Sequence, residues 1–231
     1  MKTLGLIGGM SWESTTTYYQ EINRRVREVL GGLHSAECVI VSFDFAKIEA
    51  LQRAAKWEEA GLLLDDAAKR LARAGADGLV LCTNTMHFVS HGIEAASGLP
   101  LIHIVDPTAE AIKKAGYKSV GLLGTRFTME KEFYKSRLAD KFDLNVVIPD
   151  DQDRDIVHKI IYEELCNGVI KDDSRKAYQE VIGRLKASGA ECLILGCTEI
   201  GLLIDETQSE LPIFDTARIH AIAAADWAMK E

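Results

Sequence analysis

Short apolar runs alternate with longer amphipathic stretches along most of the chain. The short runs are rich in Leu, Ile and Val and are predicted to be strands, whereas stretches in which apolar residues recur every three or four positions are predicted to be helices. The predicted strands are TLGLIG, ECVIVSFDF, DGLVLCT and PLIHIV in the first half of the chain and SVGLLGT, NVVIPD, ECLILGC and PIFDT in the second. The predicted helices span Glu13–Leu30, Lys56–Ala74, Thr108–Ala115, Met129–Phe142, Asp153–Cys166 and Ser174–Ser188.

This alternation is typical of an α/β fold, in which a mainly parallel sheet is covered by helices on both faces. The segments AGAD and SGAE each place a glycine near the end of a predicted helix, where a left-handed residue is often needed. We expect right-handed crossovers between the strands. Since ligands of such sheets bind at the carboxyl ends of the strands, the residues that follow the apolar runs are the candidates for chemistry.

Three segments of the first half recur in the second half in the same order and at nearly the same spacing. The sequence therefore predicts two homologous α/β lobes, 1–100 and 115–210, related by a pseudo-twofold axis, with an active site in the cleft between them. A C-terminal helix at about 216–231 is expected to pack on the first lobe. The matched segments begin at Lys2 and Lys118 (118 − 2 = 116), at Arg70 and Arg184 (184 − 70 = 114), and at Leu99 and Leu211 (211 − 99 = 112).

Two residues of this repeat stand where an apolar strand ends. Thr83 aligns with Cys197, so a pseudo-twofold axis makes them flank one bound molecule from opposite sides. Cys82 precedes Thr83, and because neighbours in a strand point to opposite faces, we expect it to pack under a helix. Gly196 and polar residues surround Cys197 at a strand-to-helix turn. Backbone N–H groups at that helix start are expected to lower the pKa of Cys197 and to stabilise a thiolate.

Two proton-transferring groups on opposite sides of one carbon suit the inversion of a stereocentre. One group removes a proton from one face of an α-carbon, and the other returns a proton to the opposite face. The intermediate resembles an enediolate, so the carboxylate of the bound molecule needs hydrogen-bond donors for the charge that develops. The polar side chains near the strand ends that suit this role are Asn84, Thr85, Thr125 and Thr198.

The turn GLIGGMS follows the first predicted strand and contains Met10 and Ser11. Its glycines allow the backbone to approach a ligand closely, and Met10 is a candidate binding residue for that reason. A tight strand-to-helix connection without a binding role is the alternative interpretation. The turn lacks the full G-x-G-x-x-G pattern, so it does not indicate a dinucleotide site.

Charge and length restrict the classes of partner. The chain has 231 residues, of which 47% are hydrophobic, and a formal net charge of −8. A core of substantial size is therefore available, and the acidic balance disfavours nucleic acid and anionic membranes as partners. No apolar run approaches the roughly 18 residues of a membrane span, and the N-terminus is too short and too broken for a signal peptide.

The cysteines indicate neither disulfides nor a metal. Their number is odd, and no CxxC or Cys/His spacing of a zinc site occurs. Reduced thiols in a cytoplasmic protein are the interpretation we adopt. A lone cysteine beside an apolar strand is usually a small hydrophobic residue, and this applies to Cys38, Cys166 and Cys192.

The motifs GLIGGMSWEST, CTNTMH, GLLGT and GCTEIGLL together resemble those of the aspartate/glutamate racemase family, the relatives of glutamate and hydantoin racemases. The resemblance covers nearly the whole chain. It implies two similar α/β domains with a cleft between them, a racemase that needs neither pyridoxal phosphate nor a metal, and a homodimer.

The chain departs from the family in its first motif. That motif usually reads Cys-Asn-Thr, and here the triplet is Thr83-Asn84-Thr85. The first catalytic cysteine of the family therefore maps onto Thr83, and the second maps onto Cys197. The chain looks most like the subgroup described as specific for L-aspartate and L-glutamate, in which this threonine is typical. An ordinary thiol yields some thiolate at neutral pH and a threonine hydroxyl almost none, so we expect Cys197 to be the base and initial rates to favour one enantiomer.

The resemblance also suggests where the side chain of an acidic substrate binds. The binding loop of the family maps onto DFAKIEALQR, in which Gln52 is the expected contact and Arg53 is interpreted as part of a solvated helix face. Some relatives carry a basic residue where Cys166 stands. His87 follows the first motif and is interpreted as structural, with a hydrogen bond near the motif as the alternative.

Two further hypotheses stay open beside racemisation of L-aspartate or L-glutamate. The same scaffold suits a diacid isomerase or decarboxylase, of the maleate isomerase or arylmalonate decarboxylase kind, because the carboxylate-binding hydroxyls serve those reactions too. A non-catalytic, two-lobed protein that binds an amino acid is the third hypothesis.

Overall fold

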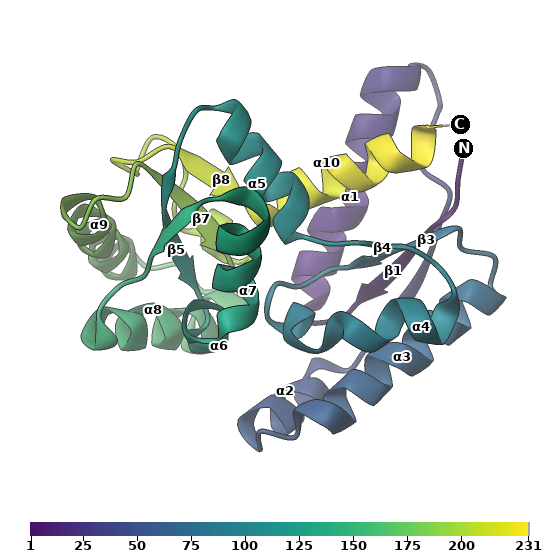
Figure 1. The fold of residues 1–231 in the computed structure, drawn as a ribbon, viewed down its shortest axis with the longest axis horizontal. Coiled ribbons are helices and arrows are strands. Elements are labelled where there is room, and N and C mark those ends of the chain that lie inside the picture. The colour runs from purple at the N-terminus through teal and green to yellow at the C-terminus, as the bar shows by residue number, and fades with distance from the viewer. Residues whose placement is uncertain (231) are drawn as a thin grey trace. The chain divides into compact units, whose positions relative to one another are not determined.

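The computed structural model describes residues 1–230 and divides into two compact units. Unit 1 is Met1–Ile104 together with the residues from His220 onward, and unit 2 is Val105–Ile219. The chain passes from one unit to the other after Ile104 and returns after Ile219, within the last helix. Figure 1 follows its course from the N-terminus to the C-terminus.

Over residues 1–230, each unit contains a four-stranded parallel sheet flanked by helices, which confirms the α/β fold that the alternation of strands and helices predicts. The strand order is β2-β1-β3-β4 in unit 1 and β6-β5-β7-β8 in unit 2. The strands of unit 1 are β1 (Leu4–Gly8), β2 (Cys38–Ser42), β3 (Gly78–Leu81) and β4 (Leu101–Ile102). Those of unit 2 are β5 (Ser119–Gly124), β6 (Asn145–Val147), β7 (Cys192–Gly196) and β8 (Ile213–Asp215).

The pairing register within each sheet matches the internal repeat of the sequence. Ile7 pairs with Leu81 in unit 1, and Leu123 pairs with Leu195 in unit 2. The offsets are 123 − 7 = 116 and 195 − 81 = 114, the same as those of the sequence matches. The central strands β1, β3 and β7 are buried along their whole length, which explains why they appear as continuous apolar runs rather than as alternating ones.

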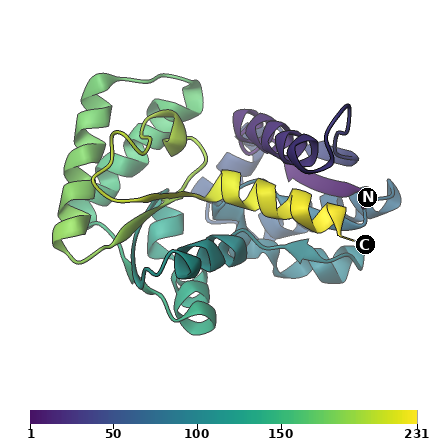
Figure 2. The same cartoon turned by 90° about the horizontal axis from the view of Figure 1, so that it is seen from above.

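Helices cover both faces of the unit 1 sheet. Figures 1 and 2 show α1 and α10 on one face, and Figure 1 shows α3 and α4 on the other. The helix α1 begins where the Ser11 hydroxyl accepts a hydrogen bond from the Ser14 N–H. It buries Tyr18, Ile22 and Val26, which share one side at helical spacing. The helices of unit 1 are α1 (Trp12–Leu30), α2 (Phe45–Arg53), α3 (Trp57–Arg73), the 3₁₀ helix η1 (Thr85–Gly92), α4 (Ile93–Ser97) and most of α10 (Thr216–Met229).

Unit 2 has the same arrangement with different helices, and Figure 1 shows α8 and α9 on one side of its sheet and α5 and α7 on the other. The helix α8 begins where the Asp150 carboxylate accepts a hydrogen bond from the Asp153 N–H at 2.9 Å. The helical segments of unit 2 are α5 (Val105–Lys114), α6 (Arg126–Glu130), α7 (Glu132–Ser136), the π-helical turn η2 (Arg137–Lys141), α8 (Asp151–Glu163), the 3₁₀ helix η3 (Leu165–Asn167), α9 (Asp172–Ala187) and the 3₁₀ helix η4 (Ile200–Leu202).

The prediction of one helix over Met129–Phe142 is wrong. Lys131 has an extended backbone that separates α6 from α7, and η2 follows. Met129 and Tyr134 are both buried, although a spacing of five residues would put them well apart around one straight helix. The interruption lets both side chains reach the core. The helix α2 is not among the predicted helix ranges, although Arg53 at its end was interpreted as part of a helix face; its nine residues form only two and a half turns, too few for a clear periodicity.

Within residues 1–230, the structure contains no helix that is both long enough and apolar enough to cross a membrane.

The close approach of α3 to β1 gives a test of the packing. A Cβ atom at Gly5 would lie 2.9 Å from the Cβ of Ala76 and 3.2 Å from that of Leu71, neither of which can move without its backbone. We expect Gly5→Ala to lower the free energy of unfolding by about 1–3 kcal/mol through overpacking. Urea denaturation followed by circular dichroism measures this.

The matched control is Gly61→Ala within α3, where a Cβ would lie 3.5 Å from Val89, an ordinary contact. Removing a helical glycine stabilises a helix by up to about 1 kcal/mol, so this variant should keep or raise the stability. An unfolding midpoint of Gly5→Ala equal to that of the control would show that the packing is looser than described.

Candidate functional site

The carboxyl ends of β1 and β3 lie side by side in unit 1, because the two strands pair in parallel up to Ile7 and Leu81. The turn with Met10 and Ser11 follows β1, and Thr83 follows β3. The Ser14 hydroxyl, in the first turn of α1, donates to the Cys82 carbonyl oxygen at 3.2 Å. The two turns are therefore held together at one edge of the sheet.

A glycine is required in the first of these turns. Gly9 has a φ of +80°, and a Cβ there would lie 2.3 Å from the Phe43 carbonyl oxygen. Gly8 also accepts a hydrogen bond from the Phe43 N–H at 3.0 Å. The chain segments that follow β1 and β2 therefore pass each other in close backbone contact, and the glycine serves this packing.

Thr83, Asn84 and Thr85 form the first motif and are all buried, with 8% of Thr83 exposed. The His87 ring holds the main chain of this motif. Its Nδ1 lies 2.7 Å from the Thr83 carbonyl oxygen, and its Nε2 accepts the Ile104 N–H at 3.3 Å. An imidazole that donates from Nδ1 and accepts at Nε2 is neutral. His87 thus makes the hydrogen bond near the motif that was the alternative interpretation, and its role there is structural.

Gln52 reaches the same region from α2. Its side chain is buried, and its amide nitrogen lies 3.0 Å from the sulfur of Met86, within η1. Met10, by contrast, belongs to a hydrophobic cluster with Ile48 and Met86. Its side chain packs in the core, so only its backbone is suited to the binding role expected of this position. The sequence-predicted residues of unit 1 are thus gathered at one edge of the sheet, and we call them the Thr83 cluster: Met10, Gln52, Thr83, Asn84 and Thr85.

Unit 2 repeats this construction with β5 and β7, whose last residues, Gly124 and Gly196, pair with each other. A Cβ at Gly124 would lie 2.9 Å from the Gly196 carbonyl oxygen, so the strands approach closely where they end. Thr125 follows β5, and Cys197 follows β7. We call Thr125, Cys197, Thr198 and Glu199 the Cys197 cluster.

Glu199 is the partner of the thiol. Its carboxylate oxygen Oε2 accepts hydrogen bonds from the Cys197 Sγ at 2.9 Å and from the Thr198 hydroxyl at 2.7 Å. The Glu199 side chain is buried, with 5% of the residue exposed. A buried carboxylate that already accepts a thiol proton is placed to take that proton completely when the sulfur acts as a base.

The expectation that the pKa of Cys197 is lowered is wrong. Burial, and then the negative charge of Glu199, raise the pKa of this thiol well above its ordinary value. The Glu199 backbone N–H lowers it, as expected for an amide at a strand-to-helix turn, but this effect is the smaller one. The resting state is therefore a thiol paired with a carboxylate rather than a thiolate.

Thr125 caps α6 and is buried. Its hydroxyl accepts the Thr128 N–H at 3.3 Å and lies 3.2 Å from the Thr128 hydroxyl. Capping uses a lone pair of the oxygen, so the O–H of Thr125 can act as a donor. This geometry is compatible with the carboxylate-binding role that the sequence suggests.

The remaining cysteines differ from Cys197 in their surroundings. Cys82 is fully buried, and burial raises the pKa of its thiol far above the ordinary value. It packs in the interior, as the strand alternation predicts. Cys192, at the start of β7, is also buried, and burial is the main cause that raises its pKa to about 12.

Glu199 and Tyr178 are the neighbours of Cys197 to which the sequence analysis assigned no role. Tyr178 is fully buried in α9, and its pKa is raised well above the ordinary value by burial and then by Cys197. The acidic residue two positions after a strand-end cysteine was a usable signal for Glu199. No signal was available for Tyr178, because an aromatic residue on the buried side of a helix is usually core. Among the described residues, the structure contains no group of three or more His, Cys, Asp or Glu side chains that could hold a metal ion.

Comparison with known proteins assigns the chain to a family. The model of the Asp/Glu/hydantoin racemases matches residues 7–224. The chain belongs to this racemase family. A candidate Asp/Glu racemase from Yersinia pestis, whose crystal structure is known, is 55% identical, with all of both chains covered and a TM-score of 0.93. An aspartate racemase homologue from Pyrococcus horikoshii is 35% identical, again with full coverage of both chains and a TM-score of 0.86.

More distant relatives differ in what they act on. The broad specificity amino-acid racemase RacX of Bacillus subtilis is 22% identical over 222 residues, which is 93% of this chain and 92% of that protein. The family assignment therefore makes the chain a racemase-family enzyme without defining its substrate. Thr83 and Cys197 occupy equivalent positions, because each follows the corresponding strand of its unit. Their separation, 197 − 83 = 114, is the offset between the β3 and β7 segments.

The Cys197–Glu199 hydrogen bond gives a prediction about the thiol. Glu199→Gln removes a negative charge beside the sulfur, so we expect the pKa of Cys197 to fall, while burial keeps it above the ordinary value. The rate of alkylation by iodoacetamide against pH, read at the Cys197 peptide by mass spectrometry, measures this pKa.

Glu206→Gln, at an exposed carboxylate of the same unit, is the control and should leave the profile unchanged. An unchanged profile in Glu199→Gln would mean that the carboxylate does not act on the thiol.

Proposed function

We propose that the protein racemises an acidic amino acid, L-aspartate or L-glutamate, without pyridoxal phosphate or a metal. The observation that carries the proposal is the part-buried hydrogen bond from the Cys197 thiol to the buried Glu199 carboxylate, just after β7. It supplies a base with a proton acceptor at the position that corresponds to Thr83 in the other unit. Membership of the racemase family supports the reaction class.

The proposed reaction leaves the total number of protons unchanged. The Cys197 sulfur transfers its own proton to the Glu199 carboxylate and removes the proton from the α-carbon of the substrate. The substrate becomes an enediolate-like carbanion, and Glu199 becomes neutral. A proton then reaches the opposite face of the α-carbon from the Thr83 hydroxyl or from a water molecule that it orients. Exchange with solvent returns Glu199 and Thr83 to their starting states.

Hydrogen-bond donors at the strand ends stabilise the carbanion in this proposal. The donors for the substrate α-carboxylate are the side chains of Asn84, Thr85, Thr125 and Thr198, with backbone N–H groups of the turn that contains Met10. Such donors act strongly because the residues around them are buried.

Gln52 is proposed to bind the side-chain carboxylate of the substrate. The homodimer and the cytoplasmic location stay predictions.

Isotope exchange tests the reaction. In D2O, the wild-type protein should replace the α-proton of L-aspartate or L-glutamate by deuterium and form the D-enantiomer, both followed by NMR. Cys197→Ser should reduce this exchange by at least about a hundredfold, because a hydroxyl loses its proton far less readily than a thiol and therefore yields far less of the basic anion. Cys82→Ala, at a thiol buried in unit 1, should retain most of the exchange.

The other outcomes separate the remaining hypotheses. Binding of the amino acid without exchange would indicate a non-catalytic binding protein. Absence of any interaction with acidic amino acids, together with turnover of maleate or a substituted malonate, would indicate a diacid isomerase or decarboxylase on this scaffold.

The unequal pair of side chains gives a kinetic prediction. Because the equilibrium constant of racemisation is one, kcat/KM must be the same for the two enantiomers, and the difference in reactivity must appear in kcat and KM together. We expect the enantiomer that presents its α-proton to Cys197 to have the larger kcat by more than about tenfold, with KM larger by the same factor. Thr83→Cys should bring the two kcat values together. Equal kcat values in the wild type would contradict the assignment of unequal roles.

A further inference from the structure

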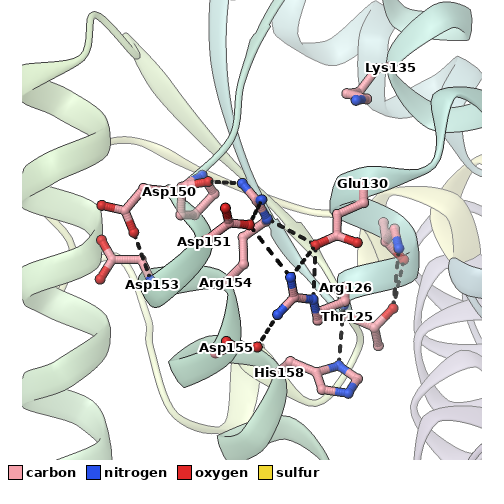
Figure 3. Close-up of polar contacts among 12 residues, drawn as sticks. Thr125, Arg126, Glu130, Lys135, Asp150, Asp151, Asp153, Arg154, Asp155 and His158 are labelled. Atoms are coloured by element: carbon pink, nitrogen blue, oxygen red, sulfur yellow. Dashed lines mark hydrogen bonds and ion pairs between the residues drawn. The ribbon is translucent and has the colours of Figure 1, made fainter.

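The turn that carries Thr125 is anchored from outside its own helix. The Thr125 hydroxyl caps the Thr128 N–H, whereas the Arg126 N–H, the first of α6, is bound by a different partner. That partner is Nδ1 of His158, which accepts the Arg126 N–H at 3.2 Å (Figure 3). His158 lies in α8, more than thirty residues along the chain, and is half-buried. The histidine thus binds a helix-start N–H other than the one that the Thr125 hydroxyl caps.

The geometry sets the state of the imidazole. Nδ1 accepts a backbone N–H, so it carries no proton, and the ring is neutral with its proton on Nε2. Protonation would place an N–H against the Arg126 N–H and would abolish the hydrogen bond. The ring packs with Phe127 at 6.3 Å and Tyr162 at 4.7 Å between centroids, and these contacts help to hold it in place.

A network of charged side chains joins the same two helices. Arg126 pairs with Glu130 at 2.8 Å and with Asp155, and Arg154 pairs with Glu130 at 3.1 Å and with Asp151 (Figure 3). These groups are largely at the surface, where each ion pair contributes little. The network aligns α6 with α8, but the contact that reaches the main chain next to Thr125 is that of His158.

We propose that His158 is a positioning residue for Thr125: its hydrogen bond to the Arg126 N–H fixes the turn after β5 and so the direction of the Thr125 hydroxyl towards the substrate carboxylate. This rests on the proposed racemase function, in which Thr125 binds that carboxylate. His158 itself does not touch the substrate or transfer a proton. Its loss should therefore weaken substrate binding more than it slows the proton transfers.

The charges around His158 give the sign of the pH dependence. Burial and then the Arg126 guanidinium lower the pKa of His158, whereas Asp155 and Glu130 act in the opposite direction with smaller effect. The neutral ring therefore persists below the ordinary pKa of a histidine. The stability from this contact is fully present above about pH 6.5, the unfolded-state pKa, and is lost as the pH falls through the lower folded-state pKa.

Two substitutions at one position separate positioning from simple stability. In His158→Asn, the amide oxygen occupies the topological place of Nδ1 and can accept the Arg126 N–H without titrating. In His158→Ala, the acceptor is removed. We expect His158→Ala to raise KM for the acidic amino acid roughly tenfold with kcat changed less than about threefold, and His158→Asn to stay within about threefold of the wild type at pH 8. His34→Asn, at an exposed loop histidine, is the matched control.

The pH profile is the readout that a merely structural role would not move. As the pH falls from 8 through the folded-state pKa of His158, KM of the wild type relative to that of His158→Asn should rise, because only the wild type loses its acceptor. A constant ratio, or equal KM values for His158→Ala and the wild type, would overturn the proposal. Circular dichroism at each pH verifies that the variants remain folded.

An NMR measurement judges the contact separately from catalysis. In the wild type, the amide shift of Arg126 should follow the titration of the His158 ring nitrogens, and this titration should be absent in His158→Asn. An Arg126 amide shift that does not change as the His158 ring titrates would overturn the proposal even in an active racemase. A wild type without α-proton exchange would refute the proposed function, while a coupled titration would still establish the anchoring contact.

Discussion

The parallel pairing of the two central strands in each unit is the constraint on which the candidate site depends. Because β1 runs beside β3, and β5 beside β7, the turns that follow them emerge at one edge of each sheet. Small residues make this possible at the strand ends, where Gly124 and Gly196 bring two backbones into near contact. Within each unit, the register of the buried strands places the polar residues that follow them at the same edge of the sheet.

The chemistry then follows from what surrounds each strand end. In unit 1, the neutral His87 imidazole fixes the Thr83 motif through its main chain. The chemistry at this strand end therefore depends on the hydroxyl and amide side chains of the motif. In unit 2, the thiol is bound to a buried carboxylate. The same strand-end position has thus acquired a proton-accepting pair in one half of the chain and a hydroxyl in the other. The two units thus share their strand order and differ in the residues that follow the strands.

The features that the sequence predicted well are those encoded in periodicity and repetition. Buried strands such as GLVL and CLILG are apolar at every position, and the recurrence of such segments at a nearly constant offset predicted the fold and the equivalence of Thr83 and Cys197. The state of the Cys197 thiol was not predictable in the same way. It depends on whether the Glu199 carboxylate turns back onto the sulfur or out to solvent, and residue order does not distinguish these conformations.

The other features that the sequence did not predict also depend on tertiary contacts. The interruption at Lys131 arises from the demands of the core on Met129 and Tyr134, which outweigh the local preference for one continuous helix. The burial of Met10 in the core is a tertiary property of the turn after β1. His158 accepts a hydrogen bond from the main chain of Arg126, 32 positions away, and no local sequence pattern predicts such a contact.

The division of the chain has a consequence for biosynthesis. Unit 2 is one uninterrupted segment, whereas unit 1 is completed only by α10. That helix brings Trp227 against Gly78 of β3, and its residue Ala228 accepts a hydrogen bond from the Lys2 N–H. During vectorial synthesis, the N-terminal sheet therefore has only α1 on this face, without α10, while the later segment emerges whole from the ribosome. Until α10 has been synthesised, part of the apolar surface of unit 1 is exposed, and exposed apolar surface of this kind makes a nascent chain prone to aggregate.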